Sequence, residues 1–307
     1  IDSLSQALGV DALLVFELIR IELREGEFYL PGSMAVVPAI DGWPAYMEYV
    51  KQFVFSDSAK ALFANHVDYI IKRTNRYNGL SYIDDPTLMS WQIGNEPRAF
   101  SEEGKEPFAA WLAEVAMQIK TLDPNHMVSV GSEGKHGCEQ DIELFEKIHA
   151  DAHIDYMNIH LWPYNWGWVK EDSLLEMLPQ TKINTKKYID EHLVLARKYK
   201  KPVVMEEFGF PRDGFQFTKE SSTQARDEFY RYVFDLIRQE REQGGLFAGC
   251  NFWGWGGFAN HTPGHTYWEA WDDYMGDPAQ EQQGLNSVFA SDSTTIAIIK
   301  SENEKLK

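Results

Sequence analysis

Apolar, strand-like segments alternate with amphipathic, helix-like segments from residue 58 onward, and this alternation predicts an α/β fold with a parallel sheet, closed as a (β/α)8 barrel. The length of 307 residues suits one such barrel or two ordinary domains. No linker rich in Pro, Gly or Ser, no repeat and no low-complexity stretch divides the chain. We therefore expect residues 1–307 to form a single domain.

The elements follow in a regular order. A helix is predicted over 58–77 and ends at Asn78-Gly79, and its apolar face is formed by Leu62, His66, Val67, Ile70 and Ile71. Acidic residues after Ser101 suit the positive end of a helix dipole and predict a helix reaching residue 122. Strands are predicted over 88–94, 127–134, 156–163, 201–209 and 246–255, and further helices over 141–150, 184–200, 222–241 and 294–307.

The first 57 residues fit this pattern less well. The segment SLSQALGVDALLVF resembles a helix end that runs into a second strand, which leaves no room for a first strand. Counting back from 246–255 as the eighth strand makes 88–94 the fourth and 201–209 the seventh. We therefore expect shortened N-terminal elements, with residues missing before Ile1 or within 15–38.

The net charge of -18, from 47 acidic and 29 basic residues, disfavours nucleic acid and anionic membranes as partners because the protein's own field would repel both. A neutral polymer meets no such barrier. No apolar stretch is long enough for a membrane span, and the first residues are not a signal peptide. The chain is thus expected to be a mature secreted protein or a cytosolic one. Cys138 and Cys250 show no CxxC spacing and indicate no disulfide framework.

Two glutamates follow apolar runs: Glu96 in MSWQIGNEPR and Glu207 in KPVVMEEFGF. Both are predicted at the carboxyl ends of parallel strands, where the active sites of barrels lie. A glycosidic bond breaks through an oxocarbenium-like transition state, so one carboxyl group protonates the leaving oxygen and a second supports the cation. The pair predicts a retaining glycosidase. The motifs HExxH, GxSxG, GxxxxGK[ST] and a helix-opening GxGxxG are absent from the sequence, which disfavours zinc protease, serine hydrolase and nucleotide chemistry.

Neighbouring residues sharpen this prediction. Asn95 precedes Glu96 and can bind the sugar 2-hydroxyl, although Asn-Glu-Pro also suits an ordinary turn; the adjacent WQIG and Arg98 favour the functional interpretation. Successive side chains of a strand face opposite sides, so only one of Glu206 and Glu207 can point to the barrel mouth. We select Glu207 and expect Glu206 to be a buried structural carboxylate.

Aromatic residues and a histidine lie near the predicted strand ends. His160 and Trp162 are two residues apart on one strand, so His160 could bind the nucleophile or a sugar hydroxyl, or be a core residue, and Trp162 could line the cleft. Trp166 could cap a loop or contact sugar. Trp253 is predicted as a stacking floor under the sugar, whereas Trp255 could equally belong to the core.

Glu133 ends the predicted strand 127–134 and has two interpretations. It could bind a sugar hydroxyl or be a turn carboxylate.

With WQIGNEPR, HLWPYNW, EEFGF and NFWGWGG in this order, the sequence resembles the family 5 glycoside hydrolases, and among them most of all the bacterial endo-β-1,4-mannanases. The resemblance covers roughly residues 38–307. It implies hydrolysis with retention of the anomeric configuration, with Glu96 as acid/base and Glu207 as nucleophile. Such a reaction requires neither a metal nor an organic cofactor. Asn95, His160 and Trp253 match positions around the cleaved bond, and Glu133 and Arg98 match substrate-side positions.

The chain departs from the family pattern in two places. It has Leu13-Leu14-Val15 where the family usually has Arg in an LRV pattern, and Trp162 where many members have Tyr.

The expected function is therefore an extracellular or periplasmic endo-β-1,4-mannanase. Its partners would be mannan, glucomannan, galactomannan or manno-oligosaccharides, and it would be a monomer. The enzymatic alternative is a cellulase or xyloglucanase of the same family. The non-enzymatic alternative is a catalytically impaired carbohydrate-binding barrel, which the incomplete N-terminal pattern would suit.

Overall fold

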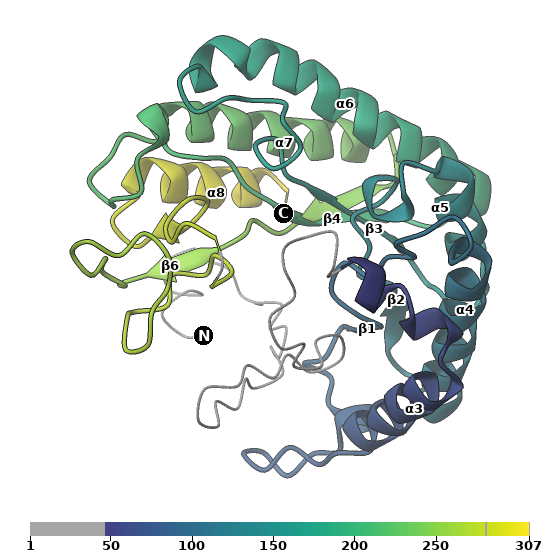
Figure 1. Cartoon of the computed structure of the whole chain (residues 1–307). Helices are drawn as coiled ribbons and strands as arrows, with labels where there is room; N and C mark the ends of the chain where they lie inside the picture. Colours follow the sequence, from purple (N-terminus) through teal and green to yellow (C-terminus); the bar gives the residue numbers. More distant parts are fainter. Residues whose placement is uncertain (1–46, 280, 307) are drawn as a thin grey trace. The chain divides into compact units, whose positions relative to one another are not determined.

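The computed structural model describes residues 47–279 and 281–306 (Figure 1). These residues belong to two compact units: the first unit ends at Asn158, and the second unit begins at Ile159. The expectation of shortened N-terminal elements and the Leu13-Leu14-Val15 segment fall on residues 1–46, outside the described residues. The prediction of a single domain stays a prediction.

The first unit is built around two short parallel strands and the helices that connect and cover them. The strands β1 (Ser90–Gln92) and β2 (Met127–Ser129) pair in parallel, with α4 (Lys105–Leu122) as the connection. Helix α3 (Asp57–Ile71) packs against α4, and α4 packs against α5 (Ile142–His149). Short 3-10 helices lie at Phe53–Phe55, Tyr82–Asp84 and His136–Cys138.

Aromatic packing joins the helices of the first unit. The Trp111 ring of α4 lies edge-on to Phe53 and Phe63, with centroid distances of 4.9 and 5.2 Å. Such pairs contribute about 0.5–1.5 kcal/mol each beyond the area they bury. Leu62, which was predicted on the apolar face of α3, is instead 71% exposed, and only Val67 and Ile71 of the predicted face are buried in α3.

The second unit contains a three-stranded sheet in the order β3-β4-β5, from β3 (Met157–Leu161), β4 (Val203–Phe208) and β5 (Phe247–Cys250). The unit boundary falls within β3, whose residues 159–161 belong to the second unit, and β4 pairs with β5 in parallel. Helices α6 (Leu174–Tyr199) and α7 (Gln224–Glu242) pack side by side along this sheet (Figure 1). A 3-10 turn, Asp213–Phe215, lies between β4 and α7.

The chain ends with a second parallel pair and a helix. Strand β6 (Trp255–Gly257) pairs with β7 (Val288–Phe289), and α8 (Ser293–Lys305) packs on α7. The pattern of parallel strands and connecting helices confirms the α/β class. The closed barrel is not explicit in these pairs.

Most predicted elements occur, but α3 ends at Ile71 and not at residue 77, and β2 ends at Ser129 and not at residue 134. Three further differences concern the later elements. Helix α6 begins ten residues earlier than expected because Pro179 lies inside it without ending it. The predicted strand 246–255 is divided, since pairing stops at Cys250 and resumes at Trp255. Strand β7 was missed because only two of its residues pair. Among the described residues, no helix is long and apolar enough to cross a membrane.

Candidate active site

Glu96 lies just beyond β1 in a segment that continues the parallel ladder of the first unit. The backbone N–H of Ile93 donates to Ser129, that of Gly94 to Val130, and that of Glu96 to Gly131 at 2.8 Å. Glu96 has a φ of 48°, in the left-handed region that few residues other than glycine adopt. The side chain is partly exposed. The backbone of this loop therefore sets the direction in which the Glu96 carboxylate leaves the chain.

Gly131 permits the loop geometry around Glu96. Its φ is +80°, and a Cβ placed there would lie 1.8 Å from the carbonyl oxygen of Gly94. Any side chain at Gly131 would force the 94–96 segment away from its partner strand, so the residue is needed for close approach of two backbones. The sequence prediction had not identified this requirement.

Arg98 and Glu133 form an ion pair within the first unit, through Nη2 and Oε2. The Glu133 side chain is 3% exposed and that of Arg98 is 23% exposed. Since a buried carboxylate is costly without a charged partner, the Arg98 guanidinium offsets the cost of burying Glu133. Glu133 therefore lies beneath Arg98, and the guanidinium is the more accessible member of the pair.

His136 is a titratable residue of this region that the sequence prediction missed. Its Nδ1 lies 2.7 Å from Nε2 of Gln140, so the ring accepts a hydrogen bond there and carries its proton on Nε2. Burial, together with the nearby positive charge of Arg98, lowers the pKa of His136 to about 4, while Glu96 acts in the opposite direction. A neutral imidazole thus lies within electrostatic reach of Glu96.

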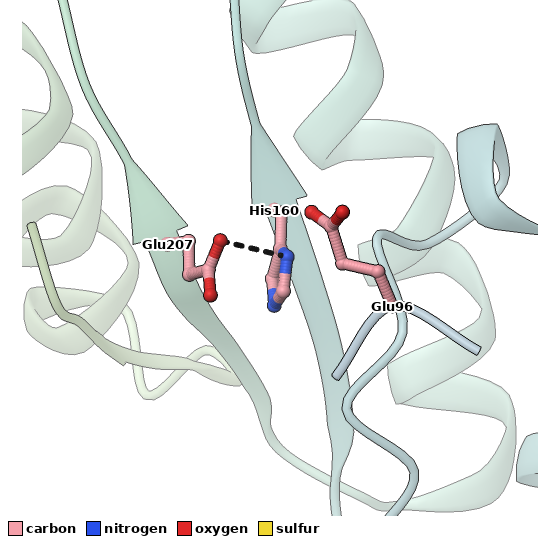
Figure 2. Close-up of side chains that lie close together, drawn as sticks. All are labelled: Glu96, His160 and Glu207. Atoms are coloured by element: carbon pink, nitrogen blue, oxygen red, sulfur yellow. Dashed lines mark ion pairs between the residues drawn. The ribbon is translucent and has the colours of Figure 1, made fainter. Parts of the chain in front are cut away.

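In the second unit, Glu207 lies near the carboxyl end of β4 and His160 lies on the neighbouring strand β3. Nδ1 of His160 is 3.3 Å from Oε2 of Glu207, and Figure 2 shows this contact as a dashed line. The side chains of His160 and Glu207 are 2% and 12% exposed. A protonated Nδ1 would donate to the carboxylate and favour its charged form, which a nucleophile requires.

The strand alternation separates Glu206 from Glu207. Glu206 is 5% exposed and counts among the buried residues of β4, whereas Glu207 is partly accessible. The predicted difference in burial between the two glutamates is therefore present.

Trp253 and Trp162 surround the residue that follows β4. The N–H of Trp253 donates to the carbonyl oxygen of Phe208 at 2.9 Å. A Cβ at Gly209 would lie 2.8 Å from the Trp162 ring, 2.9 Å from the Trp253 carbonyl oxygen and 3.0 Å from Cβ of Asn286. Gly209 thus brings both tryptophans next to the strand that carries Glu207, and both are partly exposed.

The remaining predicted residues have separate surroundings. Asn95 is exposed, as a residue that meets substrate must be. Trp255 lies in β6 and is partly exposed. Trp166 packs against Trp168 and Tyr188, with centroid distances of 5.2 and 5.1 Å, which is the arrangement of the loop-capping interpretation.

The chain belongs to the family described as GH family 5 beta-mannosidase-like, whose model matches residues 26–307. It is 29% identical over 271 residues to a protein named mannan endo-1,4-beta-mannosidase 3 of Arabidopsis thaliana, with 83% of this chain and 58% of that protein covered. Family 5 comprises glycoside hydrolases, and the resemblance to this family is confirmed.

Solved structures give the same family. A glycoside hydrolase family 5 mannosidase from Rhizomucor miehei aligns with a TM-score of 0.75 and 31% identity, covering 88% of this chain and 64% of that chain. An endo-beta-1,4-mannanase from Thermotoga petrophila aligns with a TM-score of 0.61 and 25% identity, over 83% of this chain and 52% of that one. The chain thus spans about half to two thirds of the length of these proteins.

Proposed function

We propose that this chain is the catalytic part of an endo-β-1,4-mannanase that hydrolyses internal bonds of mannan, glucomannan or galactomannan. The family membership and the names of the relatives support the class of substrate. One observation carries the chemistry: Glu207 lies near the rim of β4, partly accessible and in contact with the buried His160. A carboxylate that is held charged and reachable is what a glycosyl nucleophile needs.

In the proposed reaction, Glu207 attacks the anomeric carbon while Glu96 transfers a proton to the departing oxygen. The C–O bond to the leaving sugar breaks as the Glu207–sugar ester forms. Glu96 then removes a proton from water, which attacks the same carbon and releases Glu207. Two inversions give net retention. Neither step calls for a metal or an organic cofactor.

Other site residues have proposed supporting roles. Asn95 would bind the 2-hydroxyl of the sugar, a contact that strengthens as the oxocarbenium ion forms. Trp253 would form the floor under the sugar, with Trp162 beside it. Arg98 would contact substrate and be held in place by Glu133. We further propose that the complete fold is a closed (β/α)8 barrel, and that the protein is a monomer located outside the cytoplasm, where polysaccharides are found.

A second candidate is a β-mannosidase that removes single sugars from chain ends. The matching family is described as beta-mannosidase-like, and the Rhizomucor miehei structure with a TM-score of 0.75 is titled a mannosidase. The products separate the two activities, because an endo enzyme lowers the viscosity of a galactomannan solution before free mannose accumulates. Initial rates on galactomannan and carboxymethyl cellulose separate a mannanase from a cellulase of the same family.

Replacing each glutamate tests the assigned roles. Glu207→Ala and Glu96→Ala should each lower kcat on an aryl β-mannoside or mannan by roughly 10²–10⁴-fold or more. Azide is a small nucleophile that can enter the space left by either carboxylate. With Glu207→Ala it should give the α-mannosyl azide, and with Glu96→Ala and a good leaving group it should give the β-anomer.

Glu206→Gln is the matched control, since it changes the adjacent carboxylate of the same strand. This variant should keep most of the wild-type activity per folded molecule. If Glu206→Gln is inactive while Glu207→Ala is active, the choice of nucleophile is wrong. If both single alanine variants hydrolyse mannan at the wild-type rate, the catalytic proposal fails.

A further inference from the structure

The segment between β6 and β7 presents large aromatic side chains to solvent. We call residues 258–274 the aromatic loop. Within it, Trp271 is 100% exposed, Phe258 is 74% exposed, and Tyr267 and Tyr274 are 52% and 53% exposed. Aromatic side chains normally bury most of their surface, and a group of exposed ones marks an interaction site.

The aromatic loop is held by its own polar contacts. The Asp272 carboxylate accepts a hydrogen bond from the Glu269 N–H and lies 2.9 Å from Nδ1 of His265. The indole N–H of Trp268 donates to the Asp272 carbonyl oxygen. Hydrogen bonds from Thr262 and His265 lower the pKa of Asp272 to about 2, so this carboxylate is ionised at any ordinary pH. These contacts hold the turn that contains Trp271 in one conformation.

A second set of contacts closes the base of the loop. Nε2 of His261 lies 2.6 Å from the carbonyl oxygen of Gln283, and the Gln283 N–H donates to Thr266 at 2.9 Å. The buried Asp277 accepts from the N–H groups of Gly284 and Asn286. The exposed rings are therefore carried by a hydrogen-bonded segment, and a preformed surface loses less entropy when a ligand binds.

Trp253, which precedes β6, and Asn286, which precedes β7, both lie beside the strand that carries Glu207. Before the aromatic loop, Trp253 pairs with Phe208 through the backbone. After the loop, Asn286 comes within 3.0 Å of the Cβ position at Gly209, where the Trp253 carbonyl oxygen is 2.9 Å away. The aromatic loop thus extends from the same rim as the proposed nucleophile, and a long ligand held at that rim can reach it.

Charge identifies the kind of ligand. Residues 258–284 contain no Lys or Arg, and they include Glu269, Asp272, Asp273, Asp277 and Glu281. With a net charge of -18 for the chain, this surface repels nucleic acid and anionic lipid. A neutral polysaccharide meets no such repulsion, and the C–H faces of its pyranose rings stack on aromatic side chains.

We propose that the aromatic loop is an auxiliary binding surface for a neutral β-linked polysaccharide, with Trp271 as the main contact and Tyr267 as the second. The identity of this polymer as a β-mannan rests on the function proposed above. The surface holds a stretch of chain beyond the bond being cleaved and makes long substrates bind better than short ones.

Trp271→Ala tests this assignment by comparing a polymer with a short substrate. KM for galactomannan should rise about three- to tenfold, as expected for the loss of one stacked ring, and migration through a galactomannan-containing native gel should become faster. Both kcat and KM for an aryl β-mannoside should stay at wild-type values. Tyr267→Ala should show a smaller effect of the same kind, and Trp271→Phe, which keeps a ring, should retain most of the retardation.

Tyr77→Ala is the control, since Tyr77 is a 91% exposed aromatic residue of another loop. It should behave as wild type in every assay. Wild-type retardation and polymer KM for Trp271→Ala would overturn the proposal, and so would an equal loss on polymer and aryl mannoside, which would place the ring at the cleavage point.

The proposed binding surface and the proposed hydrolytic function can be disproved independently. If the wild-type protein hydrolyses no mannan, the proposed function fails. The loop is then judged by retardation in gels containing glucomannan or hydroxyethyl cellulose: retardation that Trp271→Ala weakens supports the surface, and none overturns it.

Discussion

The regions around Glu96 and Glu207 place a carboxylate by different means. Around Glu96, backbone hydrogen bonds and the close approach of Gly131 to Gly94 shape a loop beyond β1. Around Glu207, a regular strand supplies the position and the His160 side chain contacts the carboxylate. A side chain added at Gly131 should therefore disturb the position of Glu96, whereas removal of the His160 side chain should disturb the position of Glu207.

The difference suits the two proposed roles. An acid/base must exchange protons with substrate and water in turn, so a carboxylate on a shaped loop with partial exposure has access to both. A nucleophile must stay charged and in line with the anomeric carbon, and a histidine contact on a rigid strand provides that. Substitutions of Gly131, which supports Glu96, and of His160, which supports Glu207, can test these two roles separately.

Gly131→Ala should have the largest effect. The new Cβ would overlap the Gly94 carbonyl oxygen, and alanine at positive φ adds strain, so the unfolding free energy should fall by more than about 3 kcal/mol. The loop carrying Glu96 would shift, and kcat should drop about 100-fold or more. Urea denaturation and steady-state kinetics measure both quantities.

Gly167→Ala is the matched control for this prediction. Gly167 also has a positive φ, +71°, but a Cβ there meets nothing within 4 Å. Only backbone strain of about 1–2 kcal/mol should result, with kcat unchanged. Equal behaviour of the two variants would show that the close approach of Gly131 to Gly94 is unimportant.

His160→Ala should have the next largest effect, and it should act on Glu207. Without the imidazole contact the carboxylate loses its orientation, so kcat should fall roughly 100-fold, with a smaller change in KM. His153→Ala removes a similar contact, Nδ1 at 2.9 Å from Asp151, on a more exposed loop, and should leave kcat unaltered. A His160→Ala enzyme with wild-type kcat would contradict a positioning role.

His136→Gln should have the smallest effect, and it should appear in the pH dependence of stability. The folded pKa of about 4 is below the usual value of about 6.5, so the unfolded chain binds more protons between these pH values. The stability of the wild-type protein should therefore decrease as the pH falls from about 6.5 to about 4. Protonation would also remove the Nδ1 lone pair that accepts from Gln140.

Thermal midpoints measured across this pH range check the prediction for His136. The glutamine variant cannot take up the proton, so its midpoint should fall less than that of the wild type over the same interval. Identical slopes for the two proteins would show that His136 is not held neutral by its surroundings.

The strand positions could be predicted because buried strands need apolar runs, and alternation indicated that only one of Glu206 and Glu207 could face the site. The start of α6 could not, since Pro179 in a sequence gives no sign of whether a helix will accommodate it. His136 lies in a short 3-10 turn with no periodic pattern. Its lowered pKa arises from burial and from the nearby charge of Arg98, and both of these, like the hydrogen bond with Gln140, exist only in the folded loop.

The surroundings of Glu96 likewise depend on contacts between segments that are distant in the sequence. The motif Asn95-Glu96-Pro97 marked the residue correctly as one that follows a strand, but the need for Gly131 depends on a backbone distance between two segments. The exposed rings of the aromatic loop were not singled out, because exposure of Trp271 is a property of the fold and not of the sequence. The departure at Leu13-Leu14-Val15 stays untested, because it lies outside the described residues.

The assignment of Glu207 as nucleophile is tested most directly by trapping the glycosyl-enzyme intermediate with a 2-deoxy-2-fluoro-β-mannosyl fluoride and locating the label by peptide mass spectrometry. The fluorine at C2 slows both steps, and the fluoride leaving group lets the first step proceed. We expect one fluoromannosyl group per molecule, on Glu207. A label on another residue, or an active enzyme that stays unlabelled and releases the inverted anomer, would contradict this assignment.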